Sequence, residues 1–512
     1  MNIISFIKNI AFVTSCILKL VLTPFMPIYY LMRKLKKCVN HIKLRIKRYG
    51  ENQKKDEKKS KTSFLKKKNN LLYKISVFIL RSIFRFYHFL YWKYYYVSRK
   101  LYQKILKNTW YEIYFMLVKE YMKPTPASFS CYDIISIKKY AKQSDDVDIE
   151  IIQPSQVCEV CIPEFFECSE EKNEKYISPD IYLATVPNVS VIGGSNVVIA
   201  EKYLLNDAVA NDLEKRLDIR YASIKAVLNH TVLVEDAIEC INIEKAINLV
   251  GAASFNYYHL IVEILSRLTF VDRNERYADY PILVDEIVLK IPQYKAALFC
   301  INKGKHKIIA VKKGQQCNIH VAVLPSSNVW MPTNVYNRDT IRNSDFLISK
   351  EVLNNIRSSV QLYDEKRPFR KIFVSRKNTQ TVRLRNEESI REIFKENGFE
   401  IVYAEELTFQ EQVEYFGQAS CVVAASGAAL TNIIFCQPGT VIGCIIPEEH
   451  HFYMYSTIAH LLGLIPFFLK GKIVEKTPYA AGDSFILDKE YTCRYIMELK
   501  KRMNREEKTN AY

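Results

Sequence analysis

The chain has 512 residues, which is too long for a single hydrophobic core and favours two or three domains. Its net charge of +18 is unevenly spread. Residues 1–128 carry 28 Lys or Arg against 5 Asp or Glu, whereas residues 129–512 carry 45 against 50. The basic balance therefore belongs to an N-terminal arm and says nothing about the rest of the chain.

The arm contains three segments of different character. Residues 9–32 are mostly apolar and long enough to cross a bilayer, although Lys19 and two prolines weaken that interpretation. Residues 33–68 carry 16 basic and 3 acidic residues, which predicts a solvated, flexible linker. If residues 9–32 do span the bilayer, the basic flank at 33–48 favours a cytoplasmic location for the C-terminal body of the chain.

Residues 71–97 predict a helix with one cationic stripe among aliphatic and aromatic side chains. The stripe consists of Lys74, Arg81, Arg85 and His88. Cations beside aromatics are typical of a helix that lies on a membrane surface. A packed helix with one solvated stripe is the alternative, and nucleic acid is the least favoured partner.

The 13 cysteines are scattered and odd in number, which excludes a disulfide-stapled secreted scaffold and predicts reduced thiols in the cytosol. The segment CEVCIPEFFEC brings Cys158, Cys161 and Cys168 close together in sequence. A zinc site needs a fourth ligand at matching spacing, and no partner motif follows. We therefore expect no metal.

From about residue 240, β-branched runs alternate with periodic helices, after a strand-rich, irregular stretch at 129–240. A loop-rich section is expected at 312–360. The expected strands are 247–251, 281–286, 306–311, 370–376, 399–404, 420–426 and 440–446. The expected helices are 256–268, 292–302, 386–398, 408–419, 428–437 and 488–505.

This alternation predicts parallel sheets covered on both faces. The expected fold is α/β, with two doubly wound, Rossmann-like domains facing a cleft, preceded by a helical N-terminal arm. The expected boundaries are an arm at 1–128, a first Rossmann-like domain at 129–360, a second at 361–475, and a C-terminal helix at 476–512.

The stretch SCVVAASGAALTNIIFCQPGT predicts a phosphate site. Gly427 lets a ligand approach closely, and the helix after it begins with N–H groups that suit a diphosphate. Arg376 ends another strand of the same parallel sheet, and Arg383 and Arg385 follow it, so a guanidinium is expected at the same edge, Arg383 being favoured. The alternatives are plain helix packing at Gly427 and a solvated loop for the two later arginines.

The residues from Phe373 to Thr440 resemble glycosyltransferase family 61. Upstream, FNYYHLIVEILSRL is similar to the family's element at Asn256, His259, Glu263 and Arg267. The residues of the later pattern are Arg376, Arg383, Asn386, Glu387, Gly398, Phe399, Glu406, Phe409, Gln412, Gly427, Ala428, Asn432, Phe435, Pro438 and Gly439. Ser426 stands where eukaryotic members often have His.

The resemblance implies the GT-B architecture, with the acceptor bound by the domain at 129–360 and the nucleotide sugar by the domain at 361–475. It also implies inverting transfer of a sugar from a nucleotide diphosphate to a hydroxyl, without a cofactor. Similar bacterial members serve capsule or lipopolysaccharide synthesis, which implies a surface glycan or glycolipid as acceptor. Metal-free enzymes stabilise the departing diphosphate with cations and helix ends. The implied donor-binding residues are Arg376, Arg383, Asn386, Glu406, Gln412, Ser426, Gly427, Ala428 and Asn432.

His259 and Glu263 lie four residues apart and are expected on one helix face, with His259 as the general base and Glu263 orienting it. Asn256 and Arg267 are assigned to acceptor binding or structure. A packed histidine, an ion pair between Glu263 and Arg267, and a buried Gln412 are the structural alternatives. Two further hypotheses are an inactive sugar-nucleotide-binding scaffold and an oxidoreductase, the latter disfavoured because no G-x-G-x-x-G follows a strand.

Overall fold

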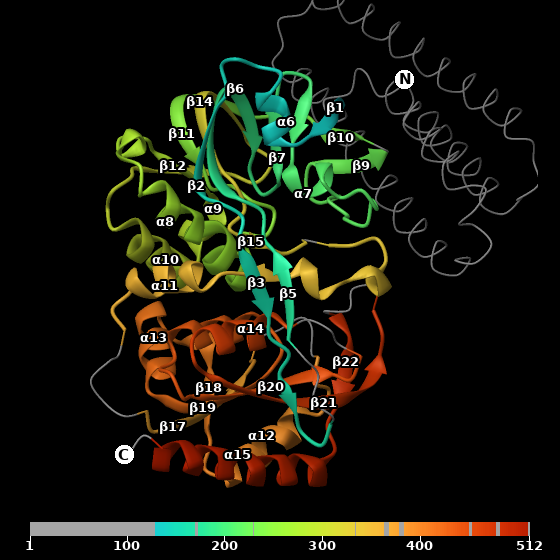
Figure 1. The fold of residues 1–512 in the computed structure, drawn as a ribbon, viewed down its shortest axis with the longest axis vertical. Coiled ribbons are helices and arrows are strands. Elements are labelled where there is room, and N and C mark those ends of the chain that lie inside the picture. Colours follow the sequence, from blue (N-terminus) through green and yellow to red (C-terminus); the bar gives the residue numbers. More distant parts are fainter. Residues whose placement is uncertain are drawn as a thin grey trace, which may run out of the picture. The chain divides into compact units, whose positions relative to one another are not determined.

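The computed structural model describes residues 129–168, 173–228, 230–332, 334–362, 368–377, 383–449, 453–477 and 482–509. The expectations for the arm, residues 1–128, lie outside the described part. Every described residue belongs to one compact unit, a mixed α/β structure built around two large sheets (Figure 1). Within the described part, no helix has both the length and the apolar character needed to cross a membrane.

The first sheet has eleven strands and is parallel on one side. Its parallel strands, in spatial order, are β13 (Ile308–Val311), β12 (Ile282–Asp285), β11 (Cys240–Asn248) and β14 (Gln316–Pro325). β14 pairs antiparallel with β6 (Ile181–Ile192), where the mostly antiparallel side begins. That side also contains β2 (Asp148–Gln153), β7 (Val197–Ala200), β8 (Tyr203–Leu205), β1 (Phe129–Ile135), β10 (Thr231–Glu235) and β9 (Ile224–Leu228).

The second sheet is a doubly wound parallel sheet with one antiparallel strand at its end. In spatial order it contains β18 (Glu400–Tyr403), β17 (Arg370–Ser375), β19 (Ala419–Ala425), β20 (Val441–Pro447), β21 (Ile465–Glu475) and the antiparallel β22 (Ser484–Ile486). The first parallel strand in the chain, β17, lies between the second and the third. The order of connections therefore reverses between β17 and β19, and ligands bind such sheets at the carboxyl ends beside this reversal.

The helices that follow these strands bury their apolar faces on the sheets. In α12 (Glu387–Glu396), for example, Ile390 and Phe394 are buried while Glu388 and Glu392 face solvent. The predicted C-terminal helix is present as α15 (Lys489–Thr509), and it packs beside α12 on the second sheet, where Tyr495 is buried. The other helices around the second sheet are α13 (Phe409–Gly417), the 3-10 helix η7 (Ala428–Phe435) and α14 (Met454–Leu461).

One segment of the strand-rich stretch 129–240 leaves the first sheet and reaches the second. β3 (Val157–Val160) and β5 (Glu174–Ile177) form a separate two-stranded antiparallel sheet, and β4 (Glu164–Phe165), which lies between them in the chain, pairs with β21 (Figure 1). The ring of Phe166 contacts the ring of Phe467 in β21 and the rings of Tyr491 and Tyr495 in α15. We call residues 157–166 the crossing segment.

The structure corrects three expectations. The section 312–360 is not loop-rich, because it contains the central strand β14 and the helix α11 (Lys350–Ser358). The helix expected at 256–268 is a π-helix, η1 (His259–Ile264), then one 3-10 turn, η2 (Leu265–Arg267), and α8 (Leu268–Val271). The helix expected at 428–437 is the 3-10 helix η7. The other expected strands and helices are present, and the helix expected at 292–302 is α10 (Pro292–Asn302). The strand expected at 247–251 is β11, which begins already at Cys240, and the short helix α9 (Glu286–Lys290) was not expected.

Candidate functional site

The turn at Gly427 lies at the reversal point of the second sheet, directly after β19. A Cβ added to Gly427 would lie only 1.5 Å from Nη2 of Arg376, so the guanidinium rests against the glycine backbone. The φ of Gly427 is 168°, which is extended backbone open to any residue, so close approach rather than conformation calls for glycine here. Arg376 follows β17, and its N–H donates to Glu387 in the first turn of α12 at 3.2 Å.

Arg383 reaches the same turn from the other side. Its Nη1 donates to the backbone oxygen of Ser426 at 2.7 Å, and its buried Nε has no hydrogen-bond partner. Burial lowers the pKa of Arg383, and the charge of Arg376 lowers it further. The structure therefore brings both arginines together at Gly427.

Among the residues that the structure describes, no carboxylate pairs with these two cations. Within the described ranges, neither guanidinium forms an ion pair, and Arg383 is largely buried. Because a guanidinium stays protonated in proteins, the lowered pKa reports an electrostatic cost that remains in the folded chain. An anion bound between the two groups relieves this cost, so the turn has the electrostatics of an anion-binding site.

The amides of Gln412 and Asn432 hydrogen-bond internally. Asn432 accepts from the Tyr257 hydroxyl at 2.8 Å and donates to Gln412 at 2.9 Å. Gln412 in turn donates to the backbone oxygen of Ala404 at 2.8 Å. Both amides are buried, so the contacts favour the structural alternative for Gln412 and a pinning role for Asn432.

The remaining residues expected near the donor lie in three different environments. Asn386 exchanges two hydrogen bonds with the backbone of Leu487, at 2.7 and 3.1 Å, so its amide holds the segment before α15. Glu406 is exposed and pairs with Lys377 at 2.7 Å. Ser426 is buried in the turn, and Ala428 begins η7 half-buried.

His259 and Glu263 contact each other on the π-helix η1. His259 Nδ1 lies 2.8 Å from Glu263 Oε1, and both side chains are mostly buried. Burial lowers the pKa of His259, but the charge and the hydrogen bond of Glu263 outweigh it, so the pKa is raised above its ordinary value. With Nδ1 held by the carboxylate, Nε2 is the ring nitrogen left to exchange a proton with a ligand.

Arg267 and Asn256 flank this pair. Among the residues with described positions, Arg267 makes no ion pair, and its buried Nε has no hydrogen-bond partner. Burial lowers the pKa of Arg267, and the charge of Glu263 opposes that shift. Asn256 accepts from the N–H of Tyr258 at 3.0 Å, which fixes the start of η1.

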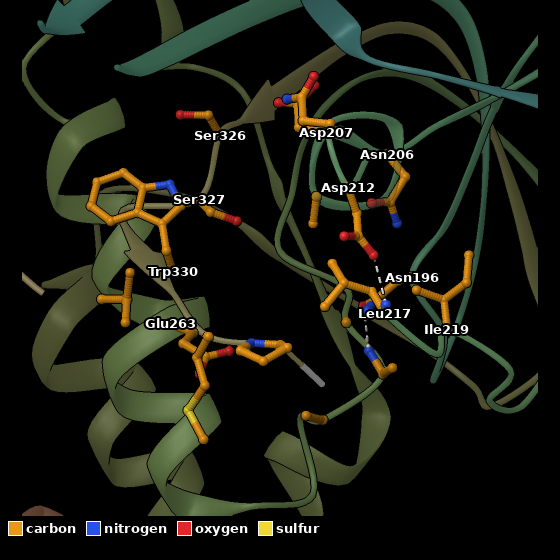
Figure 2. Close-up of a pocket in the computed structure, with 18 of the residues that line it drawn as sticks. Asn196, Asn206, Asp207, Asp212, Leu217, Ile219, Glu263, Ser326, Ser327 and Trp330 are labelled. Carbon is orange, nitrogen blue, oxygen red and sulfur yellow. Dashed lines mark hydrogen bonds between the residues drawn. The ribbon is translucent and has the colours of Figure 1, made fainter. Parts of the chain in front are cut away.

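A pocket of about 560 Å³ opens beside Glu263, at the carboxyl ends of β11 and β14. Figure 2 shows Glu263 and Trp330 on one wall and Asn206 and Asp212 on the opposite wall. The lining combines one indole with carboxylates, amides and hydroxyls. An aromatic face among directional polar groups suits a ligand rich in hydroxyls, such as a sugar.

Two tyrosines connect the histidine with the Gly427 turn. The Tyr258 ring meets the His259 ring edge-on at 5.6 Å and the Tyr455 ring at 6.0 Å. The Tyr455 hydroxyl donates to the backbone oxygen of Gly427 at 2.8 Å. The sequence analysis missed Tyr455 and Trp330, because each is brought to the site by a contact between distant parts of the chain that no local pattern shows.

An α/β fold with paired arginines at a strand reversal is typical of enzymes that act on phosphorylated substrates. Residues 257–443 match the family described as Glycosyltransferase 61, a range that contains the His–Glu pair, both arginines and Gly427. This match confirms the predicted resemblance to glycosyltransferase family 61 over these residues and supports a glycosyltransferase activity. A comparison with curated proteins gives no match.

The buried amide network predicts a graded loss of stability. Tyr257→Phe leaves one buried acceptor, Oδ1 of Asn432, without its donor, which costs about 1–3 kcal/mol of unfolding free energy. Asn432→Ala leaves both Tyr257 and Gln412 unpaired and opens a cavity, so we expect about twice that loss or more. Urea unfolding measures both effects.

Tyr294→Phe is the matched control, because its hydroxyl bonds the backbone of Phe255 in a solvent-exposed position. We expect its unfolding curve to stay close to that of the parent protein. If Asn432→Ala is as stable as the control, the amide does not tie the elements together, and its role as a ligand contact gains weight.

Proposed function

We propose that this glycosyltransferase moves a sugar from a nucleotide diphosphate to a hydroxyl of a surface glycan or glycolipid, with inversion and without a metal in the transfer step. The observation that carries this proposal is the pair of uncompensated arginines at Gly427. We also propose a GT-B arrangement. In its support, elements that follow the carboxyl end of β11 contact elements that follow β19 and β20, through Tyr257 with Asn432 and Tyr258 with Tyr455.

The leaving diphosphate would bind between the guanidinium groups of Arg376 and Arg383. Negative charge builds on it as the bond to the sugar breaks, so cations already held in place stabilise the transition state more than the ground state. Ser426, Gly427 and Ala428 add close backbone approach. Gln412, Asn432 and Asn386 would then serve the donor indirectly, by holding the turn and α12.

The acceptor hydroxyl would be deprotonated by His259. In a single displacement, the oxygen of the acceptor hydroxyl attacks the anomeric carbon of the donor sugar. The bond from that carbon to the diphosphate oxygen breaks, and the hydroxyl proton passes to Nε2 of His259. Glu263 holds Nδ1 and stabilises the imidazolium that forms. The pocket lined by Glu263, Arg267 and Trp330 offers space for the acceptor sugar.

The basic, aromatic arm is proposed to hold the enzyme on a membrane surface, with the catalytic body in the cytoplasm. Its net charge of +23 attracts anionic head groups. A lipid-linked or growing glycan acceptor is confined to that surface, so membrane attachment raises its local concentration.

The arginine pair predicts diphosphate binding that can be measured before the donor sugar is known. We expect pyrophosphate, or one of the nucleotides UDP, GDP, ADP and CDP, to raise the melting temperature of the full chain. Arg376→Ala and Arg383→Ala should each weaken this binding about 10- to 100-fold, as expected for the loss of a charge-assisted contact. Isothermal titration gives the dissociation constants.

Two further variants sharpen this test. Arg385→Ala is the matched control, because Arg385 lies in the same loop but pairs with the exposed Glu475, so its binding should match that of the parent. Gly427→Ala should weaken binding while the chain stays folded, because the new Cβ displaces only the flexible end of Arg376. Equal affinities in all four variants would falsify the diphosphate site.

The His–Glu pair predicts a shifted pH profile. A general base must be neutral, so kcat/KM rises as the pH passes the pKa of His259, which Glu263 holds above its ordinary value. In Glu263→Gln the charge is gone and burial, which lowers the pKa, remains, so the acidic limb should move to lower pH. His259→Ala should lower kcat about 10²- to 10⁴-fold.

These profiles are measured with the donor and acceptor found by screening nucleotide sugars and oligosaccharides. Thermal stability of each variant is the control for folding. Unchanged turnover in His259→Ala removes this residue from the mechanism, and an unmoved acidic limb in Glu263→Gln removes the pair from the pH dependence.

The membrane proposal predicts a difference between the full chain and a chain that starts at residue 129. The full chain should sediment with vesicles that contain anionic lipids and be released by high salt, whereas the shorter chain should remain in the supernatant. The same nucleotide-induced thermal shift in both chains confirms that the shorter one is folded. Equal sedimentation of the two chains contradicts the role of the arm.

A further inference from the structure

Three side chains that commonly bind metals meet outside the pocket, where the crossing segment lies on α14. They are Glu159 in β3, Cys161 just after it, and His460 in the last turn of α14. A carboxylate oxygen, the thiol sulfur and an imidazole nitrogen all lie within 4.8 Å of one another. Two of them belong to the CEVC sequence, and the third comes from a helix far along the chain, so spacing in the sequence could not reveal it.

Backbone contacts fix this meeting point. The N–H of Cys161 donates to the Thr457 hydroxyl at 3.0 Å, and the Ser456 hydroxyl donates to the Cys161 carbonyl. Thr457 and His460 are three residues apart in α14 and therefore lie on neighbouring positions of one helix face. The thiol of Cys161 is almost fully buried at the contact, with 1% of the residue exposed.

The side chains lack protein partners that explain their arrangement. In the described part of the chain, neither the Glu159 carboxylate nor the His460 ring has a hydrogen bond or an ion pair. The sulfur of Cys161 reaches only the backbone oxygen of Glu159, at 3.9 Å. Three groups with available lone pairs thus face one another, an arrangement that a cation stabilises.

We propose that Glu159, Cys161 and His460 bind a zinc ion, with water in the fourth tetrahedral position. Thiolate, imidazole and carboxylate together are a ligand set that suits Zn²⁺, while harder cations such as Mg²⁺ prefer oxygen ligands alone. Binding replaces the thiol proton, which is released to solvent. None of the three residues lines the pocket, and none is among the residues proposed for sugar transfer.

The ion would fasten the crossing segment to α14. That segment carries β4, the edge strand that the first part of the chain adds to the second sheet. α14 also carries Tyr455, which supports the Gly427 turn. Zinc would therefore act as a structural clamp, and its removal should lower the melting temperature.

The test uses the full chain, first stripped with a chelator and then titrated with Zn²⁺ or Co²⁺. We expect one zinc per chain, a rise in melting temperature, and a sulfur-to-cobalt charge-transfer band with Co²⁺. His460→Ala and Cys161→Ser should weaken zinc binding by more than about 100-fold, the upper figure for the loss of an outer-shell partner, and should abolish the band.

Cys168→Ser and His320→Ala are matched controls, because both residues are exposed and lie outside the cluster, and both variants should bind zinc like the parent. Parent-like binding in His460→Ala, or loss of the cobalt band in Cys168→Ser, overturns the proposal and indicates adventitious binding to thiols. His460 is exposed, so its variant decides the matter even if Cys161→Ser fails to fold. The readout is metal and not turnover, so it is independent of the proposed transfer reaction.

Discussion

Electrostatic repulsion between two guanidinium groups is the constraint on which the site depends. Arg376 and Arg383 are held at one turn by the chain itself, the first against the backbone of Gly427 and the second through the carbonyl of Ser426. Folding brings these like charges together in a partly buried place, which costs free energy. This electrostatic cost favours the binding of an anion at the turn. The absence of a Cβ at Gly427 leaves the space in which the Arg376 guanidinium lies.

The turn is held in place by contacts that come from the other sheet. Tyr257 and Tyr258 precede the π-helix that carries His259 and Glu263, and they reach Asn432 and Tyr455. One short segment thus positions the histidine pair and also buttresses the arginine turn. A π-helix is rare and marks functional sites in many proteins, and here it departs from regular geometry at the residues proposed for proton transfer.

Local patterns in the sequence predicted the strands β17, β18, β19 and β20 of the second sheet, but not their spatial order. Features of this kind depend on residues that are close together in the sequence. Examples are the short β-branched strands, the helix cap Thr408 and the small residues around Gly427. The long strand β14 lies in the section expected to be loop-rich, although its β-branched residues are visible in the sequence. The crossing segment and Tyr455 depend on pairing between distant residues, which periodicity cannot show.

The hydrogen bonds of a predicted site residue show whether it supports the fold or is available to a ligand. They show this better than the residue's position in the family pattern does. Asn386, Gln412 and Asn432 use their amides on protein partners, and a ligand that recruited them would first have to break buried hydrogen bonds. The guanidinium groups of Arg376 and Arg383, by contrast, keep N–H donors that are available to a ligand. Because unsatisfied polar groups are costly when buried, those that persist are where a ligand gains most on binding. The same reasoning singles out the unpaired carboxylate and imidazole beside the crossing segment.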